Sequence, residues 1–208
     1  MNTNIKLSGS ERKKLYMEEK PSFFYDNSEK DEVEILLDFY LSYTLRCAVD
    51  NHPNINPLVG YYAKRVLFAF LKNEIDEEKF KQLTIKEVKT WKQWERIDLI
   101  AEIEIEFDGT LINYALIFEN KLYSNVHDEQ LNLYKSIAEN FYVNHPLKNN
   151  YKRLYFFLSC LEDVPEVDFS ACKIANFTPL TFQDIRDSLA SDARTGDSLF
   201  DEFWFRYY

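Results

Sequence analysis

The segment that decides the fold is RIDLIAEIEIEFDGTLINYALIFENK, residues 96–121. Two apolar stretches flank Asp108-Gly109, and this dipeptide between such stretches is a strong signal of a two-residue hairpin turn. A turn of two residues places Phe107 opposite Thr110 and thereby fixes every pair beyond them. One face of the predicted hairpin is then apolar throughout, with the pairs Ile105–Ile112, Ile103–Tyr114, Ala101–Leu116 and Leu99–Phe118.

The other face of the predicted hairpin ends in charged residues. The same register places Asp98 opposite Glu119 and Arg96 opposite Lys121, with about 4.5–5.5 Å between the Cβ atoms of each pair. Two carboxylates at this distance destabilise a fold unless a cation lies between them or one is protonated. A divalent metal with oxygen ligands meets that need. The residues alone leave a second interpretation equally open, in which the two acids form ordinary ion pairs with Lys121 and Arg96.

The rest of the chain predicts helices and strands around this hairpin. Residues 1–27 are a polar lead-in, and residues 28–208 are expected to form one domain. Ser28 can cap a first helix and Pro57 can open a second, so we expect a helical pair before the sheet. The other expected elements are a strand at 84–91, a helix at 125–142, strands at 153–160 and near 173–177, and a helix at 182–190 capped by Thr181.

The composition sets limits on function and location. The 208-residue chain has a net charge of −10, which argues against a general nucleic-acid binder because phosphate contacts supply most of that affinity. Basic residues gather between Lys79 and Arg96, where a solvated strand edge is the plainer interpretation and a phosphate-contacting patch the alternative. Three cysteines without CxxC spacing indicate a reducing compartment. With neither a signal peptide nor a membrane-spanning run, we expect a cytoplasmic protein.

Three motifs resemble those of the PD-(D/E)XK nuclease superfamily. Arg96-Ile97-Asp98, Glu119-Asn120-Lys121 and Gln130-Leu131-x-x-Tyr134 are similar to the branch that carries RID…ENK…QLxxY, over roughly residues 84–160. Ile97 stands where the superfamily's name motif has Pro. The resemblance implies an α+β mixed sheet with a restriction-endonuclease-like αβββαβ core, an N-terminal helical pair and C-terminal helices. It also implies a divalent metal, Mg²⁺ or Mn²⁺, and hydrolysis of phosphodiester bonds.

The resemblance also implies roles for single residues. Asp98 and Glu119 would be metal ligands, with the backbone carbonyl of Asn120 a further candidate ligand. Lys121 would position the attacking water, and Gln130 would face the site from the following helix. For Tyr134, one helical turn on, packing in the core is the expected role.

Members of the superfamily tend to place an acidic residue of the first helix near the metal. Two candidates stand in this chain, and they remain open alternatives. Glu34 borders the predicted buried stripe of the helix, and the spacing of Asp38 to Ser42 is similar to an E..HS pattern of the branch, with Leu41 in place of His. Arg96, Lys89 and Lys92 are the candidate phosphate contacts.

Two functions follow from these observations. The first is a metal-dependent nuclease whose partner is nucleic acid, with DNA favoured over RNA. The second is a catalytically silent binding or regulatory module with the same fold, which the acidic charge favours. For either function, the aromatic C-terminus is a candidate surface for a homodimer or protein partner, although its spacing is more typical of a core stripe. The residues concerned are Leu199, Phe200, Phe203, Trp204 and Tyr207.

Overall fold

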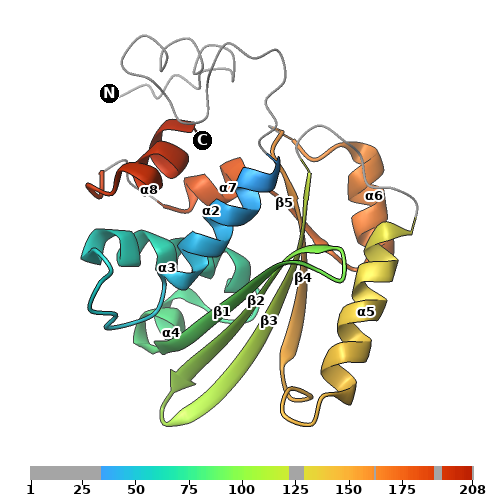
Figure 1. Ribbon diagram of the computed structural model, residues 1–208, viewed down its shortest axis with the longest axis horizontal. Coiled ribbons are helices and arrows are strands. Elements are labelled where there is room, and N and C mark those ends of the chain that lie inside the picture. Colours follow the sequence, from blue (N-terminus) through green and yellow to red (C-terminus); the bar gives the residue numbers. More distant parts are fainter. Residues whose placement is uncertain (1–33, 122–128, 162, 190–193, 208) are drawn as a thin grey trace.

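The computed structural model describes residues 34–121, 129–161, 163–189 and 194–207. Its centre is a five-stranded mixed sheet in which the strands follow chain order, so the predicted α+β mixed sheet is confirmed (Figure 1). The first three strands are antiparallel, and the last two run parallel to the third. The strands are β1 (Thr84–Trp94), β2 (Ile97–Phe107), β3 (Thr110–Lys121), β4 (Lys152–Ser159) and β5 (Thr178–Thr181).

The β2–β3 hairpin has the predicted register. Phe107 pairs with Thr110, and the ladder runs without a shift to Leu99 opposite Phe118. Asp108 and Gly109 have φ angles of 49° and 73°, and two positive values are what a type I′ turn requires. The register therefore follows from the turn, as the sequence indicates.

Helices cover both faces of the sheet (Figure 1). One apolar core, which contains Ile100 and Ile117, lies under α5 and α6. A larger core, which contains Leu99 and Phe118, lies under the remaining helices. Among the helices of the described ranges, none is long and apolar enough to cross a bilayer. The helices are α2 (Glu34–Arg46), α3 (Pro57–Leu71), α4 (Glu77–Gln82), α5 (Gln130–Asn144), α6 (Glu166–Ala175), α7 (Phe182–Asp187) and α8 (Ser198–Glu202), with a π-helical turn η1 (Phe203–Tyr207).

Most helix boundaries agree with their sequence signals. The side chain of Asn56 accepts a hydrogen bond from the Leu58 N–H at 2.9 Å and so caps α3, which begins at Pro57 as predicted. Thr181 caps α7 through a reciprocal capping box with Asp184. Ser28 and residues 125–128, where two helices were expected to begin, lie outside the described residues.

The short strand expected near residues 173–177 is wrong, because this stretch belongs largely to helix α6. Asp168, Cys172 and Ala175 are its buried residues, at the spacing of one helical face, and Glu166 and Asp168 place negative charge in the first turn. The helix ends at Asn176, whose left-handed backbone forms the C-cap. The strand β5 begins two residues later, at Thr178.

The two edge strands of the sheet differ in length and charge. β5 has four residues and contains Pro179, which lacks the N–H that a central strand would need. β1 has eleven residues and carries Lys86, Lys89 and Lys92. Both edges are therefore poor templates for a further strand.

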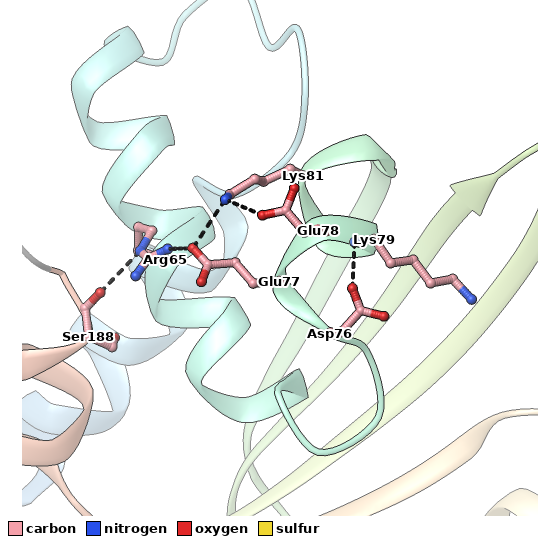
Figure 2. A network of polar contacts seen from close by, with 7 residues as sticks. All are labelled: Arg65, Asp76, Glu77, Glu78, Lys79, Lys81 and Ser188. Carbon is pink, nitrogen blue, oxygen red and sulfur yellow. Dashed lines mark hydrogen bonds and ion pairs between the residues drawn. The ribbon is translucent and has the colours of Figure 1, made fainter.

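The helix α4, which the sequence did not suggest, is held by a polar network (Figure 2). Asp76 caps it by accepting from the Lys79 N–H at 2.8 Å. Arg65 of α3 donates to Glu77 at 2.8 Å and to the Ser188 carbonyl at 3.1 Å, and so connects α3, α4 and the end of α7. Lys81 pairs with Glu77 and Glu78. Lys81, one basic residue of the stretch, is thus neutralised within its own helix.

The aromatic C-terminus packs inside its own chain. Phe200, Phe203 and Trp204 are fully buried, and the Trp204 indole N–H donates to Thr44 Oγ1 of α2 at 2.8 Å. Of the expected docking stripe, Leu199 is exposed. A homodimer or partner contact through the buried aromatics would require the C-terminus to leave the core.

The Trp204→Ala substitution tests this packing. It removes a fully buried side chain and its hydrogen bond to α2, so we expect a loss of about 3–5 kcal/mol in the free energy of unfolding, measured by urea titration. Leu199→Ala is the matched control, with an expected change within about 0.5 kcal/mol. Equal effects of the two substitutions would show that the C-terminal aromatics are not core.

Candidate functional site

The candidate site lies where the start of β2 and the end of β3 meet, between the two helical layers. Successive residues of β3 point to opposite faces, and Ile117 and Phe118 accordingly belong to different cores. Glu119 and Lys121 therefore lie on the face that α5 covers, and Asn120 lies on the face that α2 covers. The end of β3 thus contributes side chains to both layers.

Glu119 is a buried carboxylate with unequal oxygens. Its side chain is 0% exposed. Oε1 lies 2.7 Å from Lys121 Nζ and accepts from Gln130 Nε2 at 2.8 Å. Oε2 is buried and has no hydrogen-bond partner among the described residues. A buried carboxylate oxygen without a partner is costly for a fold, and a bound cation would remove that cost.

Asp98 is held at both oxygens. Oδ2 accepts from the backbone N–H of Asn120 at 2.9 Å, and Oδ1 accepts from Gln93 Nε2 at 3.2 Å. Because the N–H and C=O of one strand residue point to the same side, the Asn120 carbonyl also faces β2. Both carboxylates and this carbonyl therefore converge at the end of the hairpin.

Asp38 is the first-helix acid that the structure connects to this cluster. Its buried carboxylate accepts hydrogen bonds from Asn120 Nδ2 and, at 3.2 Å, from Gln93 Nε2, which also contacts Asp98. Glu34 is the first residue of α2, and its side chain lies outside the described part of the chain. Between the two alternatives from the sequence, the contacts favour Asp38.

Gln93 is the residue that sequence reasoning missed. A single Gln near the end of a strand carries no motif, and its role appears only when β1 and α2 are packed together. Its backbone φ of 53° is an unusual value for a non-glycine residue in a strand. The residue type alone does not predict this left-handed backbone conformation.

Gln130 and Tyr134 support the site from α5. Gln130 Nε2 donates both to Glu119 and to the Tyr134 hydroxyl, at 2.8 Å in each case. The Tyr134 ring is buried in the core under α5, in keeping with its expected packing role. The helix therefore fixes the orientation of Glu119 through one amide group.

Arg96 lies elsewhere than the sequence suggested. It was expected opposite Lys121, but β2 begins at Ile97 and Arg96 belongs to the two-residue turn between β1 and β2. Within the described residues, neither Asp98 nor Glu119 forms an ion pair with Arg96. Glu95 and Arg96 have φ angles of 51° and 74°, so this turn is also of type I′ but lacks the Gly or Asn that such turns favour.

The two lysine candidates for phosphate contact have other interactions. Lys89 Nζ pairs with Glu87 at 2.7 Å. Lys92 Nζ lies 3.9 Å from the ring centroid of Phe39, the residue after Asp38. Lys86 elsewhere in the basic stretch pairs with Glu106. The solvated-edge interpretation therefore accounts for much of this stretch.

Burial and the neighbouring acid together determine the protonation of Glu119. Burial, and then the neighbouring Asp98 carboxylate, raise the pKa of Glu119 from its ordinary value of 4.5 to about 8, and Lys121 offsets part of this increase. No group of three or more His, Cys, Asp or Glu side chains suited to a metal occurs within the described ranges. The candidate ligand set is instead two carboxylates and one backbone carbonyl, which suits a hard cation such as Mg²⁺ or Mn²⁺.

We expect Glu119→Gln to stabilise the metal-free protein at alkaline pH. The folded state keeps the Glu119 proton between pH 4.5 and about 8, whereas the unfolded state has lost it, so wild-type stability falls as pH rises through this window. Each pH unit corresponds to about 1.4 kcal/mol. Urea unfolding in EDTA should show a gain of at least about 1 kcal/mol for the variant at pH 8.5 relative to pH 5.

The control is Glu78→Gln, because the Glu78 side chain is 80% exposed. Its effect should be small and nearly independent of pH. A Glu119→Gln effect that is equally flat between pH 5 and 8.5 would contradict the raised pKa of Glu119.

Comparison with known proteins shows to which family the chain belongs. No curated protein and no solved structure matches the chain. A family model, that of the PD-(D/E)XK nuclease superfamily, matches residues 22–200, which include the whole hairpin and every side chain of the cluster. The mixed sheet with helices on both faces is consistent with a restriction-endonuclease-like fold. The chain belongs to the PD-(D/E)XK nuclease superfamily.

Proposed function

We propose that the protein is a metal-dependent nuclease that hydrolyses phosphodiester bonds of nucleic acid at the Asp98–Glu119 cluster. The observation that carries the proposal is the buried Glu119 carboxylate. One of its oxygens is held by Lys121 and Gln130, and the other has no partner among the described residues. A purely structural ion pair has no need of a second acid, Asp98, beside it.

Asp98, Glu119 and the Asn120 carbonyl would hold the divalent cation. When bound, Mg²⁺ or Mn²⁺ would supply positive charge at the scissile phosphate and make a nearby water more acidic. Asp38 approaches from α2 and shares the Gln93 amide with Asp98. In this arrangement Asp38 and Gln93 position Asp98, and the Asn120 N–H fixes its second oxygen.

Lys121 would act together with the two acids on the attacking water and the phosphate. Its ammonium lies 2.7 Å from Glu119, and its side chain is 15% exposed, so it keeps some contact with solvent. There it can orient the attacking water and stabilise the negative charge that develops on the phosphate. Its backbone carbonyl accepts from the Cys160 N–H at 2.9 Å, which fixes the end of β3 against β4.

Arg96 is the candidate contact for the substrate backbone. It is exposed and lies in a turn two residues before Asp98. Two non-glycine residues at positive φ cost stability, and such strain often marks a functional position. Lys92, stacked on Phe39 beside Asp38, adds positive charge on the α2 side.

The first experiment is calorimetric titration of Mn²⁺ into the wild type, Glu119→Gln and Glu78→Gln. The wild type and Glu78→Gln should bind saturably, with an affinity that rises from pH 6 to 8.5 because the cation must displace the Glu119 proton. Glu119→Gln should lose this binding. With Mn²⁺ present, the wild type should cleave labelled oligonucleotides, and Lys121→Met should bind Mn²⁺ yet cleave about 100-fold more slowly.

Two results would contradict the proposal. Absence of Mn²⁺ binding to the wild type at millimolar metal would exclude a preformed site. Equal binding to Glu119→Gln would place the metal elsewhere. Either result would favour the silent binding module, which the acidic net charge also permits.

The Arg96→Gly substitution tests the strained turn. Glycine adopts positive φ without steric cost, so the free energy of unfolding should rise by about 0.5–1 kcal/mol. Loss of a phosphate contact should weaken oligonucleotide binding and reduce its salt slope by about 1. The matched control is Glu95→Gly, which relieves the same turn but keeps Arg96. If both variants bind oligonucleotide equally well, Arg96 is not a phosphate contact.

A further inference from the structure

A cavity of about 110 Å³ opens at the β1 edge of the sheet, beneath the C-terminal half of α5. A water occupies about 30 Å³ of liquid, so this space accepts a group of ring size. Trp91 is partly exposed, and the Trp94 and Phe141 rings lie edge to face at 4.9 Å. The cavity is lined by Trp91, Trp94, Phe141 and Tyr142, with Glu102 and Lys148 as its charged members.

The charged members offer an acceptor beside a donor. Glu102 is 6% exposed, and its Oε1 accepts from the Tyr142 hydroxyl at 3.0 Å and from Lys148 Nζ at 2.7 Å. Both of these hydrogen bonds go to Oε1. A ligand in the cavity can therefore donate to Glu102 and accept from the Lys148 ammonium, which carries three donors.

Aromatic side chains around a carboxylate are also the usual setting for a bound cation. Here the protein's own Lys148 supplies the cation, because its Nζ lies 5.1 Å from the Trp91 ring centroid and 5.4 Å from that of Phe141. A second cation would be repelled by it. The ligand that fits this cavity is therefore a flat, uncharged ring. It would stack on an indole and carry a hydrogen-bond donor next to a hydrogen-bond acceptor on one edge. Nucleobases have this form.

The cavity lies close to the proposed catalytic site. Glu102 is four residues from Asp98 along β2, a separation of about 13 Å, and both residues point to the same face of the strand. Lys89, the cross-strand partner of Glu102, is exposed beside the cavity. A single strand that leaves the scissile phosphate can cover this distance in a few nucleotides.

We propose that this cavity binds one unstacked nucleobase of a single-stranded segment of the substrate, with Trp91 as the stacking surface and Glu102 and Lys148 as the hydrogen-bonding groups. The identity of the ligand rests on the proposed nuclease function. A base held here anchors the strand near Asp98 and Glu119. The substrate class is then nucleic acid with a single-stranded or locally opened region.

The test compares two probes in EDTA, where no metal is bound. One probe is a labelled 12-nucleotide single strand, and the other is an abasic chain of the same length and charge. The full-length wild type should bind the base-containing strand about 5- to 100-fold more tightly, as expected for stacking of one base. Titration with the unlabelled strand should also quench tryptophan fluorescence.

Variants locate this preference. Trp91→Leu keeps apolar cover over the cavity but removes the aromatic face, and it should abolish the preference for bases. Phe169→Ala, at an exposed aromatic of α6, is the control and should leave it unchanged. A wild type that binds both probes equally, or a Trp91→Leu variant that keeps the full preference, would overturn the proposal. This measurement is made without metal. Absence of Mn²⁺ binding would therefore contradict the proposed metal site but would not decide whether the cavity binds a base.

Discussion

Two carboxylates are held together in this protein by backbone pairing, against their mutual repulsion. The type I′ turn at Asp108-Gly109 sets the register of β2 and β3, and the Asn120 N–H then binds the Asp98 carboxylate. Burial of Glu119 under α5 adds a desolvation cost, which raises its pKa. Lys121 and Gln130 offset only part of this cost, so the remainder of the sheet must provide the stability that keeps the acids in place.

The sequence was sufficient for those parts of the site that depend on local geometry. Alternation along two strands and one Asp-Gly turn predicted that Glu119 and Lys121 share a face, and the family resemblance implied that Gln130 faces them from the following helix. Contacts between elements far apart in the sequence could not be predicted in this way. The link through Gln93 needs α2 packed against β1. The position of Arg96 depends on a type I′ turn that lacks its usual residues, so the turn gave no signal and the strand was predicted one residue too long.

Aromatic residues explain how an acidic chain with few glycines forms two cores on one sheet. Large rings such as Phe118 and Phe156 stack across neighbouring strands, and the C-terminal rings complete the layer over α2 and α3. These rings bury much area per residue, which permits a surface rich in carboxylates. The aromatic side chains around Trp91 lie at the sheet edge and line a cavity, and in this they differ from the rings that are fully buried in the core.

The lysines along β1 have a consequence for self-association. An edge strand has unpaired backbone N–H and C=O groups to which a strand of a second sheet can pair. Charged side chains on the edge strand make that pairing unfavourable because each charge would lose its hydrating water. At the opposite edge, Pro179 interrupts the row of donors. Both edges therefore disfavour the joining of two copies of the chain into one continuous sheet. The positive charges that suggested phosphate contacts thus also disfavour aggregation through the β1 edge of the sheet.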